Sequence, residues 1–94
     1  MSVKLIARLK AKSGCDRVLK AKLEKLVVAT LQEEGCLVYR LHVDKTDNHH
    51  FIFIEEWQSH EALDKHKQSP QLVALMKDSE DYLDHFEVIE LNAL

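Results

Sequence analysis

The chain is predicted to form an α+β domain in which helices cover one face of a four-stranded antiparallel sheet. Two observations predict this class. Four short segments carry apolar residues in the patterns of β-strands, and the stretches between them repeat apolar residues at helical spacing. The resulting order, β-α-β-β-α-β, is the ferredoxin-like arrangement. With 94 residues the chain is expected to be one domain that spans residues 1–94.

The first strand and the first helix follow from the N-terminal third of the sequence. From Val3 to Leu9 every second residue is apolar, which predicts a strand. The segment Ser13-x-x-Asp16 resembles a capping box, so a helix is expected to begin there. Gly35 is expected to end that helix in the left-handed conformation. Its apolar stripe contains Leu19, Leu23, Leu26 and Val27.

A hairpin is expected next. Residues 36–43 and 50–57 are rich in β-branched and aromatic residues, and Asp47-Asn48 is expected to form the turn between them.

Two short helices and a last strand complete the predicted fold. Ser59 can cap a helix that runs to about Lys67. Ser69-Pro70 is expected to start another helix, because proline fits its first position. Residues 86–91 are expected to form the last strand.

The predicted strands are apolar on both faces, most clearly in residues 37–39, 51–54 and 88–89. Helices can cover only one face, and soluble monomers rarely leave a large apolar patch exposed. We therefore expect a homodimer in which a second sheet covers the other face.

The composition excludes several partners. The net charge is −3 and the isoelectric point is near 6.0, which argues against nucleic acid and anionic membranes as partners. No apolar stretch is long enough to span a bilayer, and the N-terminus lacks the apolar region of a signal peptide. A cytoplasmic protein is expected, with Cys15 and Cys36 as reduced thiols.

The strongest candidate site lies between residues 55 and 66. Glu55 and Trp57 share one face of a strand, and a carboxylate on a mostly apolar face needs a partner. His66 follows Leu63 at i+3, so it can lie over the sheet on the following helix. Tyr39 on the neighbouring strand can present its hydroxyl to the same place. Glu55, Trp57, His66 and Tyr39 are therefore expected to share a pocket.

The same segment carries a resemblance to a known family. Glu55-x-Trp57, residues 59–63, His66 nine positions after the tryptophan, and Ser69-Pro70 resemble the antibiotic biosynthesis monooxygenase family. Upstream, the segment 34–39 and the Lys12-Ser13-Gly14 segment resemble further motifs of that family.

The resemblance implies a dimeric α+β barrel and an oxygenase that needs no metal or flavin. In such enzymes a phenol or quinol is deprotonated, and its anion reacts directly with O2. By this resemblance His66 is the candidate base or anion stabiliser, Glu55 its orienting partner, and Trp57 a wall that stacks on a small aromatic substrate. The sequence offers no metal-ligand pattern and no glycine-rich phosphate loop, so no cofactor is expected.

Two other functions remain open from the sequence. An isomerase or other proton-transfer enzyme could use the same histidine and carboxylate without oxygen. A non-catalytic dimeric module could bind a small apolar ligand. The haem-degrading branch of the family fits less well, because it uses an asparagine on the first strand and no asparagine precedes Asn48.

Overall fold

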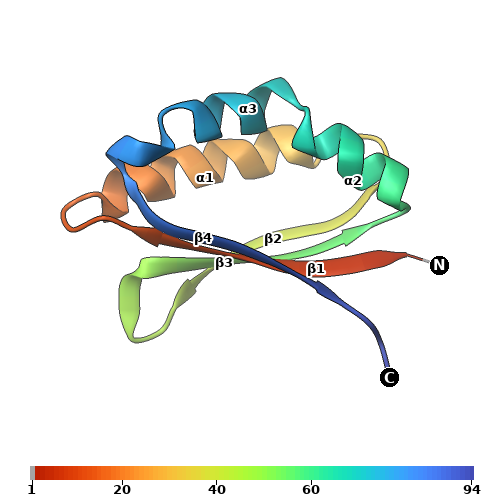
Figure 1. Cartoon of the computed structure of the whole chain (residues 1–94), viewed down its shortest axis with the longest axis horizontal. Coiled ribbons are helices and arrows are strands. Elements are labelled where there is room, and N and C mark those ends of the chain that lie inside the picture. The colour runs from red at the N-terminus through yellow and green to blue at the C-terminus, as the bar shows by residue number, and fades with distance from the viewer. Residues whose placement is uncertain (1) are drawn as a thin grey trace.

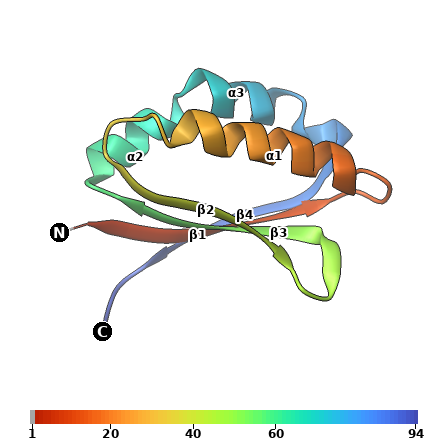
Figure 2. The same cartoon turned by 180° about the vertical axis from the view of Figure 1, so that it is seen from behind.

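The computed structural model describes residues 2–94, and it confirms the predicted fold class. The elements are β1 (Val3–Ala11), α1 (Asp16–Thr30), β2 (Cys36–Asp44), β3 (Asp47–Trp57), α2 (His60–Lys67), α3 (Pro70–Lys77), the 3-10 turn η1 (Ser79–Asp81) and β4 (Leu83–Leu91). The four strands form one antiparallel sheet in the order β2-β3-β1-β4. All three α-helices lie on the same face of this twisted sheet (Figures 1 and 2).

Strand register places the helix-facing residues in rows that cross the sheet. We name these rows the polar row, the Ala7 row and the Leu9 row. They consist, respectively, of Tyr39–Glu55–Leu5–Glu90, Leu41–Phe53–Ala7–Val88 and Val43–Phe51–Leu9–Phe86. The period of two along each strand keeps all of these side chains on the helix side.

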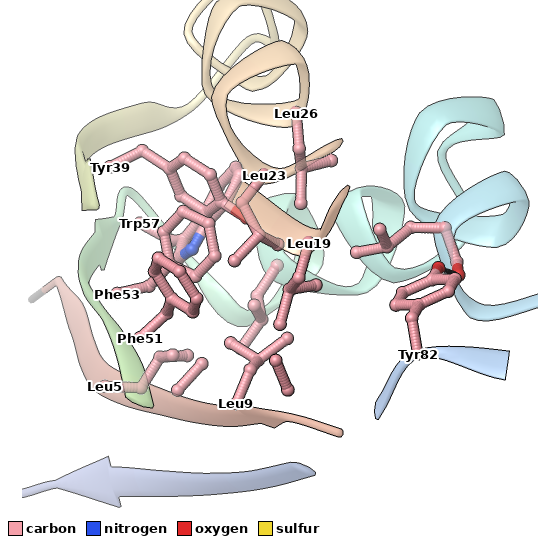
Figure 3. Close-up of a cluster of buried hydrophobic side chains, with 14 of the residues drawn as sticks. Leu5, Leu9, Leu19, Leu23, Leu26, Tyr39, Phe51, Phe53, Trp57 and Tyr82 are labelled. Atoms are coloured by element: carbon pink, nitrogen blue, oxygen red, sulfur yellow. Dashed lines mark hydrogen bonds between the residues drawn. The ribbon is translucent and has the colours of Figure 1, made fainter. Parts of the chain in front are cut away.

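The core lies between α1 and the β2–β3 half of the sheet. Leu19, Leu23 and Leu26 of α1 point toward the aromatic side chains of that half, which include Tyr39 and Phe53 (Figure 3). The three leucines are almost completely buried, as the predicted helical stripe requires. The β1–β4 half is less completely covered, because Phe86 and Val88 of β4 remain 44% and 48% exposed on the helix side.

The predicted hairpin turn was wrong by two residues. The turn is Lys45-Thr46, and Asp47 already begins β3. The Asp44 carboxylate accepts hydrogen bonds from the backbone N–H of Thr46 at 2.9 Å and from its hydroxyl at 3.1 Å. These hydrogen bonds of the Asp44 side chain stabilise a turn that lies two residues before the predicted one.

The predicted ends of the first helix were also displaced. Cys15, not Ser13, occupies the N-cap position, and α1 ends at Thr30 rather than at Gly35. Gly35 has a φ of +85°, and an added Cβ there would lie 2.6 Å from the Cβ of Ala62 in α2. Glycine is therefore suited to this position for two reasons: it adopts the left-handed backbone conformation easily, and it lets the α1–β2 loop pack closely against α2.

The two short helices start where the sequence predicts. The Ser59 hydroxyl accepts from the Ala62 N–H at 3.1 Å, and the Ser69 hydroxyl accepts from the Leu72 N–H at 3.4 Å. Pro70 is the first residue of α3. The caps fix where α2 begins and so place His66, in its last turn, against the sheet. Among residues 2–94 no helix combines the length and the apolar character that crossing a bilayer requires.

The outer face of the sheet, opposite the helices, carries an apolar strip. Ile6 of β1 lies directly between Ile54 of β3 and Ile89 of β4. Ile54 and Ile89 are 46% and 37% exposed in the single chain. The predicted apolar residues thus do extend to the face that no helix covers.

The expected homodimer remains a prediction, and the structure identifies the residue that tests it. Because Ile54 lies on the outer face and Phe53 in the core, Ile54→Asp should place an unpaired charge in a dimer interface and dissociate the dimer. Sedimentation at micromolar protein concentration shows whether each variant is a dimer or a monomer. Val28→Asp is the matched control, because Val28 is 68% exposed on α1. A folded 10.9 kDa monomer in the unmodified protein would refute the prediction.

Candidate functional site

A cavity of about 820 Å³ lies beneath the helices α2 and α3 and over the strands β1 and β4. Its floor contains Leu5, Ala7 and Leu9 of β1, and its roof contains Leu63, Leu72, Leu75 and Met76. Tyr39, Glu55 and His66 also line it. Most of the lining is apolar, which is typical of pockets for small organic ligands.

His66 is held by a carboxylate from the loop after α1. Its Nδ1 lies 3.0 Å from Glu33 Oε2, and Gln71 Nε2 donates to the same oxygen at 2.7 Å. The side chain of His66 is only 5% exposed and that of Glu33 18%. This contact uses Nδ1, and His66 is also one of the residues that line the cavity. With Nδ1–H donating to the carboxylate, Nε2 of the neutral ring is a proton acceptor.

Two aromatic rings fix the orientation of His66. The Trp57 ring lies against it with a centroid distance of 4.6 Å and an interplanar angle of 33°. Tyr39 meets it edge-on, at 5.3 Å and 67°. The imidazole is therefore confined on more than one side, which preserves its geometry when a ligand binds.

Glu55 is a buried carboxyl group in the polar row. It is 5% exposed, and its Oε1 accepts a hydrogen bond from Trp57 Nε1 at 2.9 Å. Burial raises the pKa of Glu55 from 4.5 to about 7; the Trp57 hydrogen bond opposes this rise, and the negative charge of Glu33 adds to it. Near neutral pH a large fraction of Glu55 is thus protonated and can donate a hydrogen bond into the cavity.

Tyr39 completes this end of the cavity. Burial raises the pKa of its phenol well above the usual range, and the negative charge of Glu55 adds to the effect. The ring stacks on Phe53 at a centroid distance of 4.6 Å. Tyr39 therefore stays protonated and contributes a rigid wall.

The structure changes two of the roles expected from the sequence. Glu55 was expected to orient His66, but Glu33 makes that contact and Glu55 binds Trp57 instead. Trp57 was expected to stack on a substrate, but it is fully buried and does not line the cavity. Its flat face packs on His66, so it supports the site from behind.

Sequence reasoning missed Glu33 and Gln71. Glu33 stands beside the Glu34-Gly35-Cys36 segment that carried part of the family resemblance, and this position was the available signal. No pattern in the sequence indicated Gln71, because it is a single polar residue at the start of α3. Glu33 meets both His66 and Gln71 only through the packing of the α1–β2 loop against α2 and α3.

The mouth of the cavity carries a further polar contact. His60 Nε2 of α2 lies 2.8 Å from Glu90 Oε1 of β4, and both residues line the cavity. His60 is exposed to solvent and yet lines the cavity beside Glu90.

Within residues 2–94, no three His, Cys, Asp or Glu side chains gather closely enough to bind a metal ion. Cys15 and Cys36 are free thiols. Burial raises the pKa of Cys36 to about 11, with the charge of Glu33 as a second cause, so its thiol stays protonated at neutral pH. A protonated thiol is a poor nucleophile.

The raised pKa of Glu55 predicts a pH-dependent stability. An unfolded chain releases this proton near pH 4.5, whereas the folded protein keeps it until about pH 7. The free energy of unfolding should therefore fall as pH rises across this interval, by on the order of 3 kcal/mol at most. Glu55→Gln keeps an acceptor for Trp57 and should remove that fall. Urea unfolding at fixed protein concentration, followed by Trp57 fluorescence, measures the free energy of unfolding of the unmodified protein and of Glu55→Gln at each pH.

Glu33→Gln provides the companion measurement. The charge of Glu33 helps to raise the pKa of Glu55 in the folded protein. Glu33→Gln should therefore lower this pKa, so the free energy of unfolding should stop falling at a lower pH than in the unmodified protein. If the unmodified protein and Glu55→Gln showed the same pH dependence, Glu55 would not be the group responsible.

Comparisons with known proteins agree with the fold and identify the family. The family model described as antibiotic biosynthesis monooxygenase matches residues 2–78. The chain is 32% identical to the Mycobacterium tuberculosis protein Rv0793, named as a candidate monooxygenase, over 72% of this chain and 66% of that protein. More broadly, the chain spans between about a third and two thirds of the curated relatives it matches.

Solved structures extend the likeness to the whole chain. The crystal structure of PA3566 from Pseudomonas aeruginosa is 32% identical, with a TM-score of 0.95 over 99% of this chain and 94% of that one. A crystal structure named antibiotic biosynthesis monooxygenase is 33% identical, with a TM-score of 0.91 over 100% and 99% of the two chains. These names support a monooxygenase-like function at the level of the family. With its model matched over residues 2–78, the chain belongs to the antibiotic biosynthesis monooxygenase family.

Proposed function

We propose that this protein is a cofactor-independent monooxygenase that acts on a small hydroxylated aromatic metabolite of the quinol type. One observation carries the proposal. The buried imidazole of His66 and the buried carboxyl group of Glu55, whose pKa is raised to about 7, both line one apolar cavity. Strongly perturbed titratable groups in a cavity are typical of sites that move protons.

The proposed reaction begins with removal of a proton from a ring hydroxyl. His66 Nε2 accepts this proton, and the Glu33 carboxylate at 3.0 Å from Nδ1 stabilises the imidazolium that forms. Protonated Glu55 donates a hydrogen bond to the oxygen of the substrate anion. The electron-rich anion then reacts with O2.

The electrons for this reaction come from the substrate. One quinol and one O2 give one hydroxyquinone and one water, so one oxygen atom enters the ring and the other leaves as water. The residues of this chain bind the ring, hold the proton and exclude water from the anion. The apolar lining of the cavity suits the last task, because electrostatic contacts are stronger where water is excluded.

The proposal includes a cytoplasmic homodimer. The two free thiols suit a reducing compartment, and the outer strip of Ile6, Ile54 and Ile89 suits a second copy of the chain.

A second function is favoured by the same pair of groups. A proton acceptor and a proton donor in one cavity can also move a proton between two positions of a substrate, as an isomerase does. The two functions differ in their use of oxygen.

Oxygen consumption with a panel of mono- and bicyclic quinols tests the proposal. We expect uptake of one O2 for each quinol and transfer of label from ¹⁸O2 into the product. His66→Ala should lower kcat/KM by about 10²- to 10⁴-fold, because it removes the general base. The matched control is His85→Ala, since His85 of β4 is exposed and lies outside the large cavity. It should keep full activity.

Other outcomes separate the candidates. Exchange of substrate protons with ²H2O, without oxygen uptake and lost in His66→Ala, would favour the isomerase. Equal rates for His66→Ala and the unmodified protein on a demonstrated quinol substrate would remove His66 from the mechanism.

A further inference from the structure

The cavity is far larger than one aromatic ring requires. An apolar protein cavity of about 150 Å³ accommodates benzene, whereas this one measures about 820 Å³. A ring bound at Glu55 and His66 would therefore occupy only one part of it. The substrate that fits has a second, extended part.

Polar groups are concentrated at one end of the cavity. Tyr39, Glu55 and Glu90 all belong to the polar row, His66 packs on Tyr39, and His60 contacts Glu90. The Ala7 and Leu9 rows offer only apolar side chains to the cavity. The remaining charged lining residues, Asp64, Lys67 and Lys77, are exposed at the rim. The space beyond the polar row thus suits a hydrocarbon chain.

Ala7 makes this space possible. It lies on the cavity floor between Phe53 and Val88 in register, and between Leu5 and Leu9 along the same face of β1. Alanine is the smallest side chain on this face of the middle of β1. A larger residue there would fill the floor of the cavity just beyond the polar row.

The apolar end is open on the side of β4. Phe86 and Val88 line the cavity and yet remain 44% and 48% exposed, and Val73 of α3 on the opposite rim is 54% exposed. A chain lying between them would remove apolar surface from water on both sides, which favours binding in proportion to the area covered.

We propose that the substrate is an alkyl-substituted phenol or quinol, whose ring lies at Glu55 and His66 and whose chain runs over Ala7 toward Phe86. The position of the ring rests on the proposed function. The position of the chain rests on the apolar rows and on the size of the cavity. Ala7 is then a specificity-determining residue that selects substrates by chain length.

Calorimetric titration with 4-alkylphenols from ethyl to octyl tests this proposal, because binding can be measured without oxygen chemistry. Each added methylene should strengthen binding by about fourfold until the chain reaches the open side. Ala7→Leu should flatten this series while it leaves 4-ethylphenol binding little changed. The matched control, Ala21→Leu on the exposed surface of α1, should keep the full dependence on chain length.

Val88→Thr is a second variant for the case that Ala7→Leu does not fold, since Val88 is half exposed and the change preserves its shape. It should weaken binding of octylphenol and spare ethylphenol. Equal affinity for all chain lengths, or an unchanged series in both variants, would overturn this proposal even if quinols are oxidised. If affinity rises steeply with chain length but no quinol is oxidised, the result supports the alkyl-chain proposal and counts against the proposed monooxygenase function.

Discussion

The indole of Trp57 connects the parts of the candidate site. It is completely buried at the end of β3, where its N–H is bonded to Glu55 and its ring face packs on His66. A buried indole N–H needs an acceptor, and the Glu55 carboxyl is the acceptor two residues away on the same face of the strand. The strand thus carries both partners, and α2 brings His66 onto the ring. Displacement of this one side chain would disturb the carboxyl group and the histidine together.

Two carboxyl groups near the site have different environments. Glu33 is partly exposed and is bonded to His66 and Gln71. Within residues 2–94, Glu55 accepts its one side-chain hydrogen bond from the indole N–H of Trp57, and burial favours its neutral form up to about pH 7. The charge of Glu33 strengthens this difference because like charges repel. The pair therefore offers an anion beside the proposed base and a neutral donor beside the proposed substrate.

The sheet uses its two faces differently. Its helix side buries aromatic rings beneath α1 on the β2–β3 half (Figure 3). Over the β1–β4 half the same side leaves a cavity. Its outer side carries the isoleucine strip and no helix. Since alternate residues of one strand face opposite sides, Phe53 and Ile54 serve the core and the outer face respectively.

Local patterns in the sequence were enough to predict the elements, their order and several of their ends. Alternation predicted the strands, the serines at 59 and 69 predicted both short helices, and the family motifs pointed to Glu55, Trp57, His66 and Tyr39. These features are local, because periods of two and of 3.6 residues and cap hydrogen bonds involve near neighbours in the chain. Other features follow from the packing of distant segments: Glu33 rather than Glu55 holds His66, Trp57 stands behind the cavity, and Ala7 leaves room on its floor. Glu33 and His66 are 33 residues apart, and their contact requires Gly35 to bring the loop against Ala62. The spacing of residues in the chain cannot show such a contact, because it depends on how three helices pack over one sheet.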